Sequence, residues 1–154
     1  MHFAKKTDKN GLNILIVGCG KVGTTLVEQL CNEGHDITVV DTEASRVQAL
    51  AELYDVMGIV GNGASYSTQM DAGIKDADLI IAVTGSDELN LLCCTIARKV
   101  GECAAIARVR NPDYIEDISY LREKLGLTMV INPELEMAKE AARILALPTA
   151  LEVS

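Results

Sequence analysis

The chain has 154 residues, of which 49% are hydrophobic and 23% are charged, and its formal net charge at pH 7 is −8. This length and composition predict one globular domain with a buried core and exclude a disordered chain. Residues 1–12 carry three lysines and one aspartate, so the rest of the chain is more acidic still. Because such a body repels phosphate backbones, nucleic-acid binding is also excluded.

The amino-terminal segment, residues 1–12, has no apolar run of the kind found in secretory signals. We expect it to be a disordered leader or a cloning remnant. No stretch of the chain approaches the roughly 20 apolar residues that cross a bilayer, so we expect a soluble protein. The five cysteines have no C-x-x-C spacing and are expected to be buried free thiols in a reducing cytoplasm. We place His35, which lies in a turn, at the surface, and we predict no zinc site.

Hydrophobic runs alternate with helical patterns from residue 13 onward. Continuous apolar runs predict strands at 13–18, 36–41, 55–60, 77–83, 103–109 and 127–131. Apolar residues at helical spacing predict helices at 21–32, 43–53, 66–73, 88–100 and 112–121. This alternation predicts an α/β fold, a Rossmann-like doubly wound six-stranded parallel sheet in the order 3-2-1-4-5-6 with helices on both faces. A ligand crevice is then expected between the ends of the first and fourth strands, where the strand order reverses.

A last helix is predicted at 133–147, where Pro133 and two early glutamates suit a first turn. Its apolar stripe consists of Leu135, Ala138, Ala142 and Leu145. The stripe has two interpretations, because the helix would either dock on its own sheet or pack against another copy of the chain. Residues 148–154 begin a further segment, which indicates that the natural polypeptide continues.

A glycine pattern lies between the first predicted strand and the first predicted helix, in the stretch ILIVGCGKVGTTL (14–26). It follows a strand, opens a helix and precedes an acidic residue, Asp41, at the end of the second strand, as a dinucleotide-binding fingerprint does. Gly18 allows the tight turn, Gly20 lets a pyrophosphate approach the backbone, and Gly23 lets helix and sheet pack closely. The amino terminus of the helix would then stabilise the pyrophosphate.

Asp41 is expected to accept hydrogen bonds from the ribose hydroxyls of an adenosine. A 2′-phosphate would meet the negative charges of Asp41 and Glu43, so NAD(H) or an adenine nucleotide is favoured. We expect Asp41→Ala to abolish the binding of ribose-containing ligands and to leave the fold intact. Lys21 stands between the second and third glycines, which does not match the G-K-[ST] order of a Walker motif.

Further loops are expected at the same edge of the sheet. The sequence GNGAS (61–65) follows the third strand and would either close over the adenine or form a plain turn. Thr84 and Gly85 end the fourth strand beside the crevice. The polar residues that follow are assigned to capping the next helix: Asp87, Glu88 and Asn90.

Arg108 and Arg110 lie two positions apart at the end of the fifth strand and are expected to share a face. Two cations in an acidic domain suit a phosphate or a second charged ligand. The alternative is ion pairing with the nearby carboxylates of Asp113, Glu116 or Asp117. For Arg108 we favour phosphate contact.

Catalytic groups are scarce in this sequence. No Ser/His/Asp or Cys/His set is evident, and there is no second domain to hold a substrate beside a nicotinamide. Two functions remain. A regulatory nucleotide sensor predicts binding without turnover, whereas the cofactor-binding domain of an NAD-dependent oxidoreductase predicts a catalytic domain encoded downstream.

Six segments resemble, in order and spacing, the N-terminal domain of TrkA/KtrA-type regulators, the RCK or KTN domains that control bacterial potassium uptake. They are ILIVGCGKVGTTLVEQL, DITVVD, GNGAS, DAGIKDADLIIAVTGSDELN, ARVRNPDY and VINPELEMA. The resemblance covers about residues 13–154. It identifies residues 13–147 as a TrkA-N nucleotide-binding domain and residues 148–154 as the start of a linker to a further C-terminal domain.

The resemblance implies a sensor that is not an enzyme, binds NAD(H) or ATP/ADP, and works in the cytoplasm at the inner face of the cell membrane. It implies a homodimer through the helix at 133–147, a ring in the full-length regulator, and a membrane-embedded Trk- or Ktr-type potassium-translocating subunit as partner. Glu134 lies where some members hold a divalent cation near the nucleotide phosphates; the other interpretation is stabilisation of the first helical turn. The candidate nucleotide contacts are Gly18, Cys19, Gly20, Lys21, Val22, Gly23, Asp41, Gly61, Asn62, Ala64, Thr84, Gly85 and Arg108.

Overall fold

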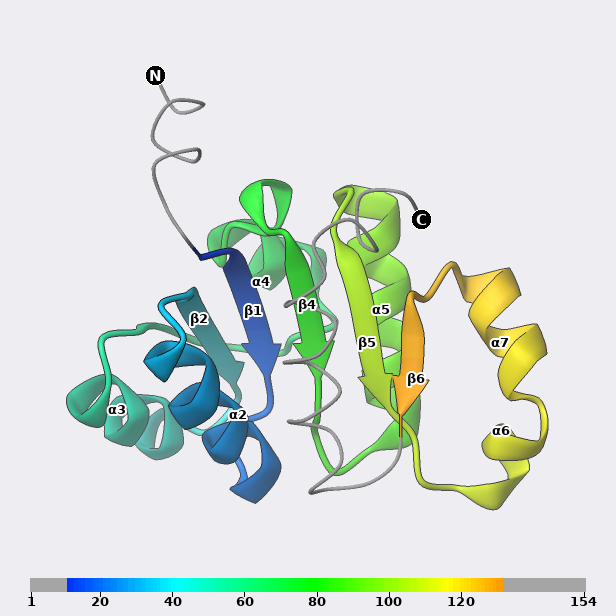
Figure 1. The fold of residues 1–154 in the computed structure, drawn as a ribbon, viewed down its shortest axis with the longest axis horizontal. Coiled ribbons are helices and arrows are strands. Elements are labelled where there is room, and N and C mark those ends of the chain that lie inside the picture. Colours follow the sequence, from blue (N-terminus) through cyan, green and yellow to red (C-terminus); the bar gives the residue numbers. More distant parts are fainter. Residues whose placement is uncertain (1–10, 132–154) are drawn as a thin grey trace.

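The computed structural model describes residues 11–131 and shows one six-stranded parallel sheet (Figure 1). Its strands are β1 (Asn13–Val17), β2 (Asp36–Asp41), β3 (Met57–Val60), β4 (Leu79–Ala82), β5 (Ala104–Arg108) and β6 (Met129–Ile131). Their order is β3-β2-β1-β4-β5-β6, and each neighbouring pair is parallel. The expected fold class is confirmed. In register, Val17 of β1 lies between Val40 of β2 and Ala82 of β4, so the strand order reverses beside β1.

Helices cover both faces of the sheet (Figure 1). They are α2 (Lys21–Asn32), α3 (Ala44–Leu53), α4 (Tyr66–Asp71), the 3₁₀ helix η1 (Ile74–Asp76), α5 (Asp87–Val100), α6 (Pro112–Glu116) and α7 (Ile118–Leu125). The apolar sides of α2 and α3 pack on one face, and those of α4 and α5 pack on the other. Both α6 and α7 lie beyond the β6 edge and carry the chain from β5 to β6 (Figure 1).

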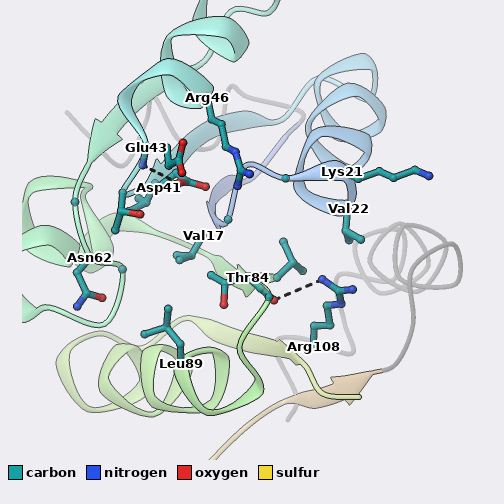
Figure 2. A pocket seen from close by; sticks show the side chains of 18 residues that line it. Val17, Lys21, Val22, Asp41, Glu43, Arg46, Asn62, Thr84, Leu89 and Arg108 are labelled. Carbon is teal, nitrogen blue, oxygen red and sulfur yellow. Dashed lines mark hydrogen bonds between the residues drawn. The ribbon is translucent and has the colours of Figure 1, made fainter. Parts of the chain in front are cut away.

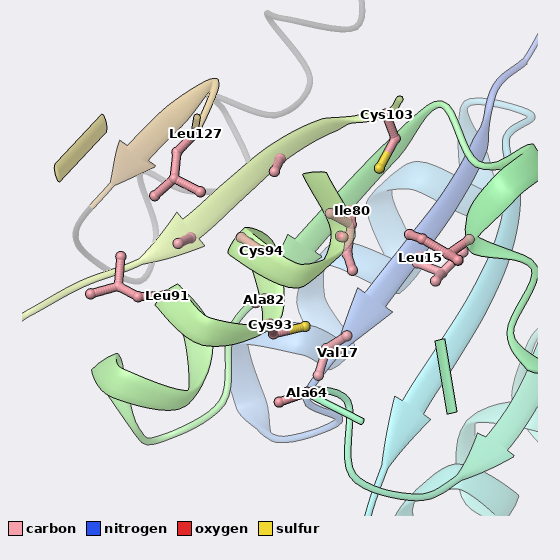
Figure 3. Packing of buried hydrophobic residues seen from close by; sticks show 14 of the residues in the cluster. Leu15, Val17, Ala64, Ile80, Ala82, Leu91, Cys93, Cys94, Cys103 and Leu127 are labelled. Atoms are coloured by element: carbon pink, nitrogen blue, oxygen red, sulfur yellow. The ribbon is translucent and has the colours of Figure 1, made fainter. Parts of the chain in front are cut away.

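Each face of the sheet has its own core, because successive strand residues point to opposite sides. On one side Ile16 packs in a cluster with Leu26 of α2. On the other side Ile80 packs in a cluster with Cys93 and Cys94 of α5 (Figure 3). The central strands are therefore apolar on both sides, which explains their continuous hydrophobic runs.

Two helical segments differ from the expectation. The helix expected at 112–121 is two helices, α6 and α7, separated at Asp117, whose backbone leaves the helical region with φ −103° and ψ 22°. No residue of α6 is buried, so packing does not stabilise one continuous helix there. Gly73 ends the helix at 66–73 as expected, with φ 84° in the left-handed region, and the unexpected η1 follows it.

The expectation for the cysteines is confirmed, and the one for His35 is not. All five cysteines are free thiols, four of them buried and Cys31 partly buried, as expected. The surface position expected for His35 is wrong. Its side chain is only 9% exposed, its Nδ1 accepts the N–H of Leu12 at 2.9 Å, and its Nε2 lies 3.6 Å from a carboxylate oxygen of Glu33. Sequence alone missed the contact with Leu12 because the two residues precede different strands, β1 and β2, and lie 23 positions apart in the chain.

Two further expectations concern membrane-spanning segments and the two ends of the chain. Within residues 11–131, none of the helices has the length and apolar character to span a membrane. The leader expected at 1–12 lies largely outside the described residues, and the helix expected at 133–147 and the segment 148–154 lie wholly outside them.

Candidate functional site

A cavity of about 450 Å³ opens where the strand order reverses, at the carboxyl ends of β1 and β4 (Figure 2). Its walls come from the residues that follow β1, β2, β3 and β4, together with Arg108 at the end of β5. This size lies in the range of about 300–1,000 Å³ that small-molecule sites occupy. The crevice expected from the strand order is therefore present.

The three glycines of the loop after β1 have the geometry that the fingerprint requires. Gly18 has φ 109°, a left-handed conformation that a side chain would strain. A Cβ on Gly23 would overlap the carbonyl oxygen of Gly18, so only glycine lets α2 approach the loop this closely. Gly20 faces open space, since the nearest atom to a Cβ there is Nη1 of Arg46, at 3.9 Å. The backbone of the loop is therefore accessible from the cavity at Gly20.

The amino terminus of α2 is available for an anion. Gly20 is the N-cap residue and gives no side-chain hydrogen bond, and the first turn contains no acidic residue. By contrast, Ser65 and Ser86 cap α4 and α5 through their side chains. Uncapped N–H groups at the positive end of a helix dipole are an anion-binding arrangement, which fits a nucleotide phosphate.

Asp41 connects β2 to the glycine loop. Its Oδ2 accepts the N–H of Cys19 at 2.7 Å, and its Oδ1 accepts the N–H of Glu43 at 2.9 Å. Each carboxylate oxygen has two acceptor sites, so Asp41 keeps acceptor capacity toward the cavity that it lines. Burial, and then the negative charge of Asp41, raise the pKa of Cys19 to about 12, while Arg46 acts in the opposite direction.

Asn90 connects the two strand ends, those of β4 and β5, that form one wall of the cavity. This fully buried amide accepts the N–H of Thr84 at 2.9 Å and its hydroxyl at 2.7 Å. It donates to the carbonyl oxygens of Thr84 at 3.1 Å and Arg108 at 2.9 Å. Helix capping by Asn90 is therefore wrong, because Ser86 is the N-cap residue and accepts the N–H of Leu89 at 3.1 Å. Instead, Asn90 joins the ends of β4 and β5.

The two other residues assigned to capping bond to the following segment. Asp87 Oδ2 accepts the N–H groups of Arg110 and Asn111, at 3.0 and 2.7 Å. Glu88 accepts the hydroxyl of Tyr114 at 2.7 Å, and this bond lowers the pKa of Glu88. Both residues still stand in the first turn of α5, where acidic side chains are favourable.

Arg108 and Arg110 do not share a face of the cavity. The side chain of Arg108 is buried to 8% exposure, lines the cavity, and donates from Nη1 to the carbonyl oxygen of Thr84 at 3.5 Å (Figure 2). Arg110 lines a separate shallow hollow with Asp87 and Glu88. The chain turns away after β5 because Asp87 holds the backbone of Arg110, which the two-residue spacing could not show.

Most of the expected contact residues line the cavity: Gly18, Gly20, Lys21, Val22, Asp41, Gly61, Asn62, Thr84, Gly85 and Arg108. Three do not. Cys19 packs in the core beneath α2, Gly23 lies under the loop, and Ala64 packs in the opposite core. Glu134 lies outside the described residues. Within residues 11–131, no group of three or more histidine, cysteine, aspartate or glutamate side chains is placed to hold a metal.

The lining residues outside the list of candidate contacts are Val17, Val40, Thr42, Glu43, Arg46, Gly63, Val83 and Leu89. Of these, Glu43 and Gly63 were already expected at this edge of the sheet, Glu43 beside Asp41 and Gly63 in the GNGAS loop. Several of these lining residues end or directly follow strands, and the strand order alone places strand ends at the crevice. The sequence gives little reason to select Arg46 as a site residue, because it is one of several charged residues on a predicted helix. Only the structure shows that it reaches from α3 toward the glycine loop (Figure 2).

The strand order, the glycine loop and the acidic residue at the end of β2 define a Rossmann-type nucleotide-binding domain. The family model of the TrkA-N domain matches residues 14–133, and the chain belongs to this family.

Curated relatives carry the same family name. The chain is 41% identical over 142 residues to a Trk system potassium uptake protein TrkA homolog of Archaeoglobus fulgidus, covering 92% of this chain and 32% of that one. It is 39% identical over 146 residues to Trk system potassium uptake protein TrkA of Haemophilus influenzae, covering 93% and 32%. The chain thus spans about a third of the length of these relatives.

Solved structures agree on the fold. The TrkA-N domain of the inner membrane protein ybaL from Escherichia coli superposes with a TM-score of 0.71 at 26% identity, covering 88% of this chain and 97% of that one. The GsuK channel bound to NAD superposes with a TM-score of 0.67 at 26% identity, covering 80% and 22%. A GsuK structure bound to ADP gives 0.66 at 26% identity, covering 80% and 32%.

Proposed function

We propose that this chain is the nucleotide-sensing domain of a regulatory subunit of a potassium transport system, and that it binds NAD(H) or ATP/ADP without turning it over. The observation that carries the proposal is the cavity at the β1/β4 reversal, where an open glycine loop and an uncapped helix face Asp41. The names of the TrkA relatives and the NAD- and ADP-bound GsuK structures support it.

In this proposal the nucleotide phosphates bind at the amino terminus of α2, over Gly20. The ribose hydroxyls donate to Asp41, whose carboxylate is already held in place by two backbone N–H groups. Negative charge from Asp41 and Glu43 at this end opposes a 2′-phosphate, which favours NAD(H) over NADP(H). Arg108, buried in the opposite wall, supplies a positive charge toward the distal part of the ligand.

Regulation follows if the two states of the full-length protein bind the nucleotide with different affinity, because only differential affinity shifts a conformational equilibrium. The partner is a membrane-embedded potassium-translocating subunit of Trk or Ktr type, and the domain works in the cytoplasm at the inner membrane face. Homodimerisation through the helix expected at 133–147, assembly into a ring, and a divalent cation at Glu134 belong to the same proposal.

An oxidoreductase cofactor domain is the weaker candidate. Hydride-transfer enzymes place a proton-transfer group beside the nicotinamide. In the part of the chain that the structure describes, the cavity lining contains no histidine, tyrosine or cysteine. The other groups of the lining that could transfer a proton, Asp41, Glu43 and Lys21, lie at the end proposed for the ribose and the phosphates, which supports a sensor.

Calorimetric titration of the chain with NADH, NAD, ATP and ADP, with and without Mg²⁺, tests the proposal. We expect saturable one-site binding, different affinities for the four ligands, and unaltered nucleotide when the mixture is analysed afterwards. Absence of binding by all four ligands contradicts nucleotide sensing by this domain. Conversion of a bound nucleotide contradicts its assignment as a non-enzyme.

A further inference from the structure

Arg46 stands over the open side of the glycine loop. It lies in the first turn of α3, and its Nη1 is 3.9 Å from the position that a Cβ would take on Gly20. Gly20 is the point where the backbone is open to the cavity. The guanidinium of Arg46 therefore lies within reach of a phosphate bound at the amino terminus of α2.

Within residues 11–131, Arg46 makes neither a hydrogen bond nor an ion pair. The carboxylate of Asp41 accepts the N–H groups of Cys19 and Glu43 and forms no ion pair with Arg46. Glu43 is three residues away and also forms no ion pair with Arg46. The positive charge of Arg46 is felt at the glycine loop, since it opposes the rise in the pKa of Cys19.

Arg46 is exposed to solvent at the rim of the cavity, so its guanidinium is accessible to a bound ligand. Arg46 lies in the first turn of its own helix and beside the uncapped amino terminus of α2, so two positive helix ends face it. An anion bound there would interact favourably with both helix termini and with the guanidinium. Lys21, the other cation of this wall, extends away from Asp41 and Arg46 (Figure 2).

We propose that Arg46 binds the 5′-phosphate groups of the nucleotide and sets the preference of the site for ligands of higher phosphate charge. The inference rests on the proposed nucleotide site and adds a side-chain phosphate contact to the backbone contacts of the glycine fingerprint. A planar guanidinium with several donors suits a diphosphate or triphosphate. ADP and ATP carry a free terminal phosphate, whereas both phosphates of NAD are esterified, so Arg46 strengthens ADP and ATP binding most.

Two other contacts for Arg46 make different predictions. An arginine near the end of β2 can accommodate the 2′-phosphate of NADP, although the carboxylates of Asp41 and Glu43 at the same rim oppose that charge. A guanidinium can also stack on the adenine, and that contact would contribute equally to adenosine and to ADP.

The test is calorimetry of wild type, Arg46→Gln and Arg46→Lys with adenosine, ADP, ATP, NADH and NADPH at one fixed ionic strength. Lys75→Gln is the matched control, because it removes one positive charge from an exposed residue of η1, before β4 and so at the opposite edge of the sheet. We expect Arg46→Gln to weaken ADP and ATP by about tenfold or more, NADH by less, and adenosine by less than about twofold. Arg46→Lys should recover part of the loss, and Lys75→Gln should match wild type.

Each alternative outcome is distinct. Equal losses for adenosine and ADP would assign Arg46 to the adenine, a loss confined to NADPH would assign it to the 2′-phosphate, and unchanged affinities would remove it from the site. All three overturn this inference while leaving the nucleotide site in place. If wild type itself binds none of the five ligands, the proposed function fails, and the inference fails with it.

Discussion

The carboxylate of Asp41 accepts the backbone N–H of Cys19 at 2.7 Å, so the end of β2 holds the glycine loop that follows β1. The same carboxylate accepts the N–H of Glu43 at the start of α3. Asp41 therefore has a structural role in addition to its proposed contact with the ribose.

This linkage changes the prediction for Asp41 variants. Asp41→Ala removes two hydrogen-bond acceptors and should lower the free energy of unfolding by about 1–3 kcal/mol as well as weakening nucleotide binding. Asp41→Asn keeps one carbonyl acceptor and should lose less stability than Asp41→Ala. Urea denaturation with calorimetry measures both effects. An Asp41→Ala protein as stable as wild type would show that the loop does not depend on this carboxylate.

Asn90 should be a large contributor to stability for its size. Asn90→Ala leaves the Thr84 N–H and hydroxyl and two carbonyl groups without their buried partner, and we expect a loss of about 2–4 kcal/mol in the free energy of unfolding. Asn32→Ala is the control, since Asn32 is exposed at the end of α2. Similar denaturation midpoints for the two variants would contradict the role of Asn90.

Gly23 should tolerate no side chain. A Cβ there overlaps the Gly18 carbonyl oxygen, so Gly23→Ala must move α2 from the sheet and should cost about 3 kcal/mol or more. Gly85→Ala is the control for stability, because no atom lies within 4 Å of a Cβ at that position. Thermal unfolding of both variants checks the difference, and a fully stable Gly23→Ala protein would contradict the packing described for the loop.

Thiol reactivity should follow burial. Burial raises the pKa of Cys93 to about 12 and that of Cys103 to about 11, and it raises the pKa of Cys94 well above its usual value. Because the thiolate is the reactive form, a disulfide reagent at pH 8 should modify the partly buried Cys31 first and the buried cysteines only after unfolding. Peptide mapping after timed labelling identifies the sites. Rapid labelling of Cys93 or Cys94 in the folded protein would contradict this order.

The fold and the position of the site were predictable because they depend on patterns local in sequence. Apolar runs between helical segments define the strands, and the spacing of Gly18, Gly20 and Gly23 reflects one strand-to-helix turn. The strand order then places Asp41 and Thr84 at the same edge. Each of these steps needs only periodicity, turn chemistry and the handedness of crossover connections.

The functions of individual polar residues were not predictable in the same way. Asn90 and His35 form hydrogen bonds to groups distant in sequence, and Arg46 reaches from α3 toward the glycine loop. An asparagine near the start of a helix is most simply interpreted as a cap. In Asn90, the packing of α5 on β4 and β5 turns the side-chain amide toward the ends of both strands. The break at Asp117 likewise reflects missing packing on α6, which a sequence pattern does not record.

The central claim is that a nucleotide phosphate lies against the backbone at Gly20, and one variant separates this claim from folding. Gly20 has an extended backbone, φ −79° and ψ −155°, and a Cβ there meets only the end of Arg46 at 3.9 Å, so Gly20→Val should fold normally. Its side chain would occupy the approach of the phosphate. We therefore predict that calorimetry shows wild-type stability and at least about tenfold weaker binding of ADP and NADH. A Gly20→Val protein that binds both nucleotides as wild type does would contradict the account.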